Sequence, residues 1–226
     1  MVRRMAHTGG PGRPAASRHR NARELLLNAA TELFAEQGVA ATTFATIAKR
    51  AGLTPAMLHY YFKDREELLD AVVEERIARV ITHVWDPVEA GGNEADLVGG
   101  IVERLLEGIE RMPWIPSTWM REILNEGGLL RSRVLRCLPF EKVRILAQAI
   151  AVGQAQQKLN PDLDPLLTVF STLGLVMLHM ATMNFWSDTF HRKPLRRDAI
   201  RRHITGLLLH GLEPDDRHKW KASSNR

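Results

Sequence analysis

Apolar residues recur along most of this chain at spacings of three and four, which is the period of an amphipathic helix. The first such segment begins near Arg18 and ends near Gln37, and Gly38 follows where a helix C-terminus favours glycine. No segment alternates polar and apolar residues with a period of two, so the pattern predicts an all-α protein. Further helices are predicted over 64–84, 94–112, 117–126, 129–158, 163–187 and 195–211.

Residues 43–62 hold two short helical patterns separated by one glycine: TFATIAKRAGLTPAMLHYYF. Thr43 is a suitable N-cap, because its hydroxyl can accept a hydrogen bond from a free amide of the first turn. The apolar residues that follow at i, i+3, i+4 and i+7 form one narrow stripe: Phe44, Ile47, Ala48 and Ala51. Gly52 stands where the chain leaves this helix, since glycine adopts a left-handed conformation at little cost.

The second helix of the motif begins with its own cap. Thr54 precedes Pro55, and proline suits the first helical position because its missing N–H would be unpaired there. Helical rotation divides the later residues into an inner face, Leu58, Tyr61 and Phe62, and an outer face, Ala56, His59, Tyr60 and Lys63. Both helices are too short to be stable alone, so we expect them to pack on each other and on the first helix. The pattern predicts a helix-turn-helix, whose second helix can enter the major groove of DNA.

The positive charge of the chain is concentrated at its two ends. Residues 1–63 contain nine Lys or Arg against three acids, residues 81–185 nine against twelve, and residues 186–226 ten against five. The formal charge of the 226 residues is +5. A basic N-terminal part on a slightly acidic middle is typical of a protein that binds nucleic acid at that end.

Residues 1–17 are rich in glycine, proline and arginine and lack a helical period, so we expect a disordered basic arm. Six arginines and no acid precede Glu24: Arg3, Arg4, Arg13, Arg18, Arg20 and Arg23. Such an arm could follow the DNA backbone or reach the minor groove. It could equally be a solvated tail that contributes only to solubility, and the sequence leaves both alternatives open.

Three segments of this chain resemble the N-terminal domain of the tetracycline-repressor (TetR) family of bacterial transcription regulators: ELLLNAATELFAEQG, TTFATIAKRAGLTP and HYYFKDREELLDAV. The resemblance covers residues 18–80, and beyond them it is one of size, helicity and layout. It implies a homodimer that binds a palindromic operator, usually as a repressor, and leaves it when a small molecule binds the C-terminal domain. The helix that starts near Asp64 joins the two domains and would act as the lever.

The resemblance also implies roles for individual residues. Thr43 and Phe44 would begin the first helix near the DNA backbone, and Lys63 and Arg65 would meet phosphates. The recognition helix would present Thr54, Pro55, Ala56, Met57, His59 and Tyr60.

Two positions depart from the family pattern. His59 stands where a tyrosine that contacts DNA is common, and imidazole reaches less far. Ala45 stands where some members have a base-reading arginine. Because the outer face has few bidentate readers, contacts with thymine methyl groups and DNA shape are expected to carry more of the specificity.

The later helices hold many large, adaptable side chains, which is typical of a ligand pocket within a helical bundle. The candidate effector-binding residues are large Trp and Met side chains and a few polar residues that could orient a small molecule. They are His83, Trp85, Trp114, Trp119, Met120, Glu122, Met177, His179, Met180, Met183 and Asn184. The alternative for each is ordinary core packing, or a place at the surface or at a subunit contact. The sequence does not identify the effector.

Residues 166–186 contain no charged side chain and are long enough to span a bilayer. Their six polar residues are a heavy load for such a span, and a helix that is apolar all round also occurs where one face packs on a partner. We therefore prefer a subunit interface and expect no membrane partner. The helices at 163–187 and 195–211 would form a four-helix seam with two-fold symmetry.

The sequence lacks the common catalytic and cofactor motifs, such as a Gly-rich phosphate loop, Cys-x-x-Cys, His-Glu-x-x-His or a Gly-x-Ser-x-Gly elbow. No enzyme activity, cofactor or metal site is predicted. The single cysteine, Cys137, leaves no internal disulfide and suits a reducing cytosol. With no signal peptide recognised, we expect a cytoplasmic protein.

The sequence therefore predicts a basic arm over 1–17 and a three-helix DNA-binding domain over 18–64. An effector-binding and dimerisation domain follows over 65–213, and a polar tail over 214–226. The favoured function is a ligand-responsive repressor. The alternative is a cytosolic small-molecule-binding or enzymatic helical protein in which the helix-turn-helix is only structural.

Overall fold

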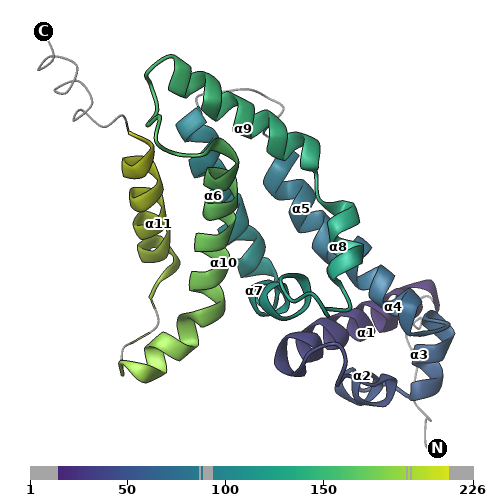
Figure 1. The fold of residues 1–226 in the computed structure, drawn as a ribbon. Helices are drawn as coiled ribbons and strands as arrows, with labels where there is room; N and C mark the ends of the chain where they lie inside the picture. The colour runs from purple at the N-terminus through teal and green to yellow at the C-terminus, as the bar shows by residue number, and fades with distance from the viewer. Residues whose placement is uncertain (1–14, 87, 89–93, 192, 194, 214–226) are drawn as a thin grey trace, which may run out of the picture.

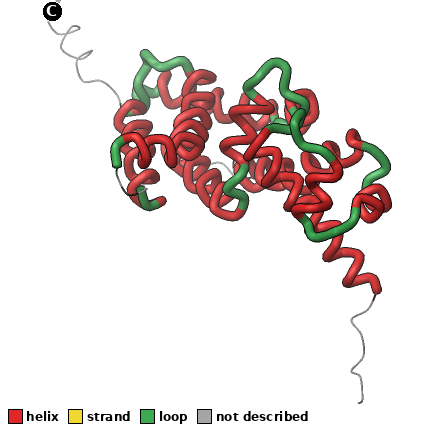
Figure 2. Tube along the Cα trace, turned by 90° about the horizontal axis from the view of Figure 1, so that it is seen from below, coloured by secondary structure: helices red, strands yellow, loops and turns green. Residues whose placement is uncertain are grey.

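The structure is a computed structural model that describes residues 15–86, 88, 94–191, 193 and 195–213. Within these ranges the chain forms helices and loops and no strand, which confirms the all-α prediction. Figure 2 shows the same division along the trace. Most of the predicted arm and all of the polar tail fall on residues 1–14 and 214–226, which lie outside the described residues.

The N-terminal helices form a compact end of the molecule, seen at the lower right of Figure 1. The helix α1 (Ala15–Gln37) packs on α2 (Phe44–Arg50), which packs on α3 (Pro55–Tyr61). Gly38 and Gly52, with φ angles of 85° and 68°, allow the left-handed turns that end α1 and α2. The helix-turn-helix predicted over 43–62 is therefore present.

A long helical rod leads from this end into the rest of the chain. It consists of α4 (Arg65–Val72), the π-helical turn η1 (Val73–Ile77) and α5 (Ala78–Trp85). The next helix, α6 (Glu94–Arg111), packs against α5 and α11, and α7 (Ile115–Thr118) runs into a second π-helical turn, η3 (Trp119–Ile123). Turns of this kind occur often at functional sites.

The remaining helices are α8 (Arg131–Cys137), α9 (Phe140–Ala155), α10 (Pro165–Thr189) and α11 (Arg197–Leu212). The single helix predicted over 129–158 is wrong, because the chain turns at Leu138 and Pro139. Leu138 has an extended backbone, as a residue before proline prefers, and proline cannot donate the helical hydrogen bond. The break leaves room for α8 and α9 to take different directions (Figure 1).

The buried apolar side chains form two hydrophobic cores. The first joins α1, α2, α3 and α4, and it also takes in Ile123, Leu130 and Val134 from the later helices. The second lies among α5, α6, α9, α10 and α11. The helix-turn-helix end thus shares its core with residues from beyond the predicted boundary at 64–65.

Candidate DNA-binding surface and effector cavity

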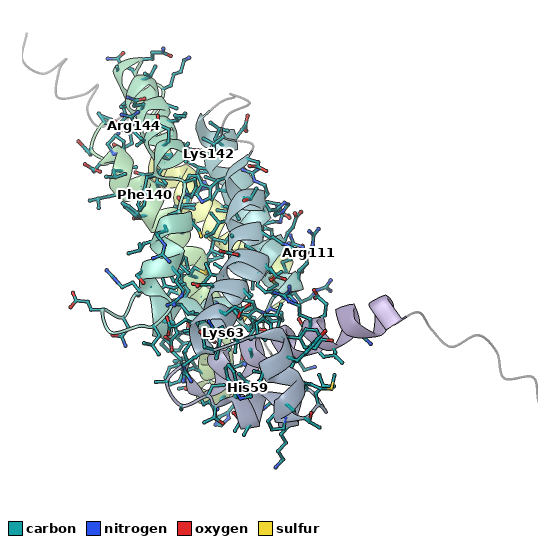
Figure 3. All side chains as sticks on the ribbon, turned by 90° about the vertical axis from the view of Figure 1, so that its right-hand side faces the viewer. His59, Lys63, Arg111, Phe140, Lys142 and Arg144 are labelled. Atoms are coloured by element: carbon teal, nitrogen blue, oxygen red, sulfur yellow. The ribbon has the colours of Figure 1, made fainter. Side chains whose placement is uncertain are left out.

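The helix α3 buries one face and presents the other. Leu58 and Phe62 are fully buried, whereas Tyr60 is 74% exposed and His59 and Ala56 are also exposed. Figure 3 shows His59 and Lys63 at one end of the molecule and Phe140 and Arg144 at the other. The outer face predicted for this helix is therefore available to a partner.

Caps made within the motif fix α2 and α3. The Thr43 hydroxyl accepts from Thr46 N at 3.2 Å, and the Thr46 hydroxyl accepts from Thr43 N at 3.0 Å, which is a capping box. The Thr54 hydroxyl accepts from Met57 N at 3.3 Å, with Pro55 in the first position. These bonds hold the start of α2 and the start of α3 in place.

Aromatic contacts complete the outer face. Phe44, half-buried at the start of α2, meets the imidazole of His59 at a centroid distance of 5.1 Å. Tyr60 meets Tyr61 edge to face, also at 5.1 Å. Met57 is half-buried and is therefore less exposed than Tyr60.

Arg65 lies in a different environment from the one expected. Its half-buried guanidinium donates to the carbonyl of Thr42 at 2.8 Å and to that of Val39, both in the turn between α1 and α2. The side chain therefore holds this turn to α4. Lys63, by contrast, is exposed, and its contact with a phosphate stays a prediction.

Ion pairs tie the N-terminal end to the helical rod. Arg23 of α1 pairs with Glu75 at 2.5 Å, and the buried Arg76 pairs with Glu24 at 2.6 Å. The hydrogen bond from Arg23 lowers the pKa of the Glu75 carboxyl, although partial burial opposes the shift. The η1 turn thus meets α1 through one acceptor, Glu75, and one donor, Arg76.

A cavity of about 410 Å³ opens between η3, the Leu138–Pro139 break and α10. A smaller space of about 40 Å³, which reaches Ile77 of η1, shares five lining residues with this cavity. The residues that line both parts are apolar: Trp85, Trp119, Leu138, Leu173 and Met177. The remaining lining residues of either part are also uncharged. A guest here would meet hydrophobic and aromatic surface.

The predicted effector residues separate into groups. Trp85, Trp119, Met120 and Met177 line this cavity. Trp114 and Met180 pack on the cores. The Nε2 atom of His83 lies 3.2 Å from Oε2 of Glu107, and Asn184 is exposed on α10.

Glu122 does not face the cavity. Its buried carboxylate accepts from Val39 N at 2.8 Å and from Leu129 N at 3.1 Å, so the prediction of an effector contact is replaced by a structural one. The helical pattern does not indicate Leu138 and Leu173 as cavity residues, although the Leu-Pro pair at 138–139 indicates a break.

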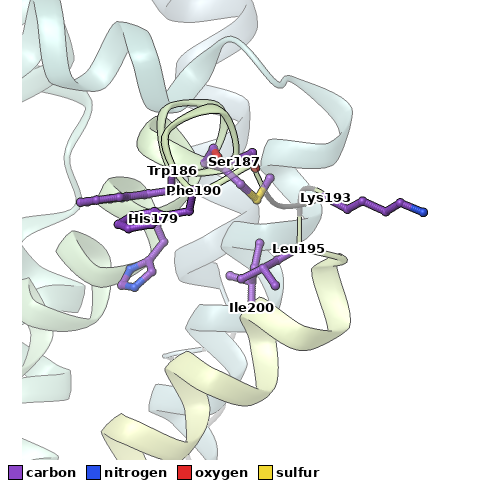
Figure 4. A pocket seen from close by; sticks show the side chains of 8 residues that line it. His179, Trp186, Ser187, Phe190, Lys193, Leu195 and Ile200 are labelled. Atoms are coloured by element: carbon purple, nitrogen blue, oxygen red, sulfur yellow. Dashed lines mark hydrogen bonds between the residues drawn. The ribbon is translucent and has the colours of Figure 1, made fainter.

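His179 and Met183 line a second space of about 580 Å³, between the end of α10 and the start of α11. Trp186 stacks on Phe190 at 5.7 Å along one wall. In Figure 4, Lys193 extends away from these rings. This space is open at the surface and aromatic.

The outer faces of α10 and α11 expose many large apolar side chains: Leu166, Leu167, Phe170, Leu178, Phe185, Trp186 and Leu207. Among the described residues, α10 is the helix long and apolar enough to cross a membrane, by length and composition only. One such helix is weak evidence of a membrane span.

The fold and the exposed face of α3 define a helix-turn-helix DNA-binding protein with a helical C-terminal domain. Residues 26–72 match the family model described as bacterial regulatory proteins, tetR family. The chain is 30% identical over 189 residues to the HTH-type transcriptional repressor KstR2 of Mycobacterium tuberculosis, covering 83% of this chain and 90% of that one. This chain belongs to the TetR family and is a DNA-binding transcriptional regulator.

Solved structures share the fold. The structure of the ketosteroid transcriptional regulator KstR2 of Mycobacterium tuberculosis has a TM-score of 0.68 at 20% identity and covers 86% of this chain and 95% of that one. The transcriptional regulator FadR of Bacillus subtilis, in complex with stearoyl-CoA, has a TM-score of 0.61 at 18% identity and covers 84% of this chain and 98% of that one.

A further sequence relative is the regulator AcrR of Shigella flexneri. It is 29% identical over 142 residues, which are 61% of this chain and 56% of AcrR.

Proposed function

We propose that this protein is a homodimeric repressor that binds a two-fold symmetric operator through α3 and releases it when an apolar small molecule enters the cavity beside η3. The observation that carries the DNA-binding part is the division of α3. Its Leu58 side is buried, while His59 and Tyr60 face outward on a helix fixed by the Thr54 cap. Such a helix can enter the major groove without unfolding any of its own domain.

The apolar faces of α10 and α11 support the dimer. Exposed patches of this kind mark interaction sites, because water contact with large apolar side chains is unfavourable. Two helices from each subunit would bury them in one isologous interface. The two copies of α3 would then stand at the two half-sites of the operator. We expect the dimer in the cytoplasm.

The lining of the cavity supports an effector whose buried part is uncharged. Among the described residues that line it there is no Asp, Glu, Lys, Arg or His, and an unpaired charge inside would lose its hydration without compensation. FadR of Bacillus subtilis holds stearoyl-CoA, a ligand with a long acyl chain. An acyl chain or another flat or elongated hydrocarbon fits this lining, with any charged group left outside.

Selection of bound DNA from a random pool tests the proposal. The full-length protein should enrich an inverted repeat, and a shift assay should show that binding to this repeat survives excess nonspecific DNA. The variant Tyr60→Ala should bind the same repeat about tenfold more weakly, since one contact of a recognition helix contributes about 1–3 kcal/mol. If no sequence is enriched at moderate salt, the repressor function is refuted and the small-molecule-binding alternative gains support.

A further inference from the structure

Glu122 connects the cavity to the helix-turn-helix through one short element. The π-helical turn η3 is five residues long. Trp119 and Met120, at its start, line the cavity, whereas Glu122 and Ile123 are buried against the N-terminal core. A displacement of this turn by a guest would therefore reach Glu122 directly.

The Glu122 carboxylate holds the turn that positions α2. Oε1 accepts from Val39 N at 2.8 Å, and Oε2 accepts from Leu129 N at 3.1 Å. Charged acceptors make stronger hydrogen bonds than neutral ones, and a buried carboxylate depends on them because it has lost water. The bond to Val39 spans 83 residues of sequence, so it is purely a product of the tertiary fold.

Glycines make room for this arrangement on both sides. A Cβ at Gly128 would lie 2.0 Å from the Glu122 carbonyl oxygen, which is backbone and cannot move aside. A Cβ at Gly38 would lie 3.5 Å from Oε1, at ordinary contact, but its φ of 85° favours glycine. Gly128 thus lets the chain pass close to the Glu122 backbone, and Gly38 lies at ordinary contact distance from the carboxylate.

Val39 is held from two directions. Its N–H donates to Glu122, and its carbonyl accepts from Arg65 of α4. The side chain of Val39 is fully buried. The turn that leads into α2 is therefore fixed by one residue of the linking rod and one residue of the effector domain.

We infer that Glu122 is a positioning residue that couples occupancy of the cavity to the orientation of the helix-turn-helix. This inference rests on the proposed function. A guest beside Trp119 shifts η3, the bond from Val39 N to Glu122 lengthens, and α2 and α3 leave the arrangement that fits the operator. The link at Arg65 remains, so the end pivots on α4 and stays folded.

A double-mutant cycle tests the inference without a known effector. Leu173→Trp is the probe, because Leu173 lines both parts of the cavity and a larger side chain occupies it permanently. Glu122→Met keeps the length of the side chain and removes both oxygens that accept from Val39 N and Leu129 N. Glu126→Met, at an exposed position four residues on, is the matched control. Binding to the selected operator is measured for each protein and for the double variants.

We expect Leu173→Trp and Glu122→Met each to weaken operator binding about tenfold, within the usual range of coupling between sites. The double variant should be little weaker than either single one, since the same link is lost in both. Glu126→Met should bind like the unaltered protein, and Leu173→Trp should weaken binding by the same factor with and without it. If Leu173→Trp weakened operator binding by the same factor in the unaltered protein and in the Glu122 variant, the inference would be overturned. Unchanged binding of either single variant would do the same.

Amide hydrogen exchange decides the matter if Glu122→Met does not fold. In Leu173→Trp alone, the Val39 amide should exchange about tenfold faster than in the unaltered protein. The Phe62 amide, which donates to Leu58 at 2.9 Å, should stay protected. An unchanged Val39 amide would overturn the inference. Failure of the unaltered protein to enrich any DNA would instead refute the proposed function, before any variant is compared.

Discussion

The imidazole of His59 packs against the ring of Phe44, with centroids 5.1 Å apart and planes tilted by 52°. This contact joins the first residue of α2 to the outer face of α3. It gives His59 a fixed position although the residue is exposed. The shorter reach of imidazole, compared with the tyrosine common at this position in the family, is thus combined with a defined orientation.

His59→Ala should weaken operator binding about tenfold, because a side chain that contacts DNA contributes about 1–3 kcal/mol. The free energy of unfolding should change by no more than about 0.5 kcal/mol, as is usual for an exposed site. His59→Tyr is the control and should bind at least as well as the unaltered protein. Fluorescence anisotropy with the selected operator measures the first effect and urea unfolding the second. If His59→Ala bound the operator as tightly as the unaltered protein, His59 would not be part of the DNA interface.

Thr54→Ala should destabilise the protein by about 1 kcal/mol, because the first turn of α3 loses the hydroxyl that accepts from Met57 N at 3.3 Å. Thr54→Ser keeps that oxygen and should recover most of the loss. Urea unfolding of the three proteins gives the comparison. If serine and alanine are equally destabilising, the methyl group and not the cap is what matters there.

Acid should weaken the attachment of α1 to the rod. The pKa of the Glu75 carboxyl is lowered in the folded protein, first of all by the hydrogen bond from Arg23. The ionised Glu75 contributes its full stabilisation at a pH above 4.5, the ordinary pKa that applies to the unfolded chain. This contribution is lost as the pH falls through the lower pKa of the folded protein. Glu75→Gln should therefore lower the free energy of unfolding at neutral pH and match the unaltered protein in strong acid.

Urea unfolding at a series of pH values checks this. Glu74→Gln is a suitable control, since Glu74 is exposed beside Glu75 in the same turn. The control should follow the unaltered protein at each pH. A constant difference between Glu75→Gln and the unaltered protein down to strong acid would contradict the titration of Glu75.

Leu207→Lys should convert the dimer to a monomer. Leu207 is 53% exposed on α11, and a charge there would be buried without a partner in the proposed interface. Sedimentation equilibrium should show the change, and operator binding should fall with it, because one subunit reaches only one half-site. Leu135→Lys, on an exposed position of α8, should stay dimeric. A dimeric Leu207→Lys would place the interface elsewhere.

The helix-turn-helix could be predicted because its bonds are local. The caps at Thr43 and Thr54 reach three residues forward, and Gly52 acts on its own backbone. The inner position of Leu58 follows from helical rotation alone. Features of this kind can be recognised within a segment of about twenty residues.

The effector domain was less predictable because its site is made of distant residues. Trp85 and Trp119 lie on the cavity, but Leu138 and Leu173 complete it only because the break before α9 and the course of α10 bring them there. Glu122 was expected to face a ligand. In the fold it faces Val39 instead, since helical period does not say which neighbour covers a buried face.

The sequence by itself determined the all-α fold class, the corner at Gly52 and the outward face of α3, because propensity, capping and period act over a few residues. Only the tertiary structure decided that Arg65 holds the Thr42 carbonyl, that Glu122 holds the Val39 amide, and that Trp119 and Met177 meet at one cavity. Those contacts join residues 23 and 83 positions apart, and which polar groups meet over such distances depends on how whole helices pack.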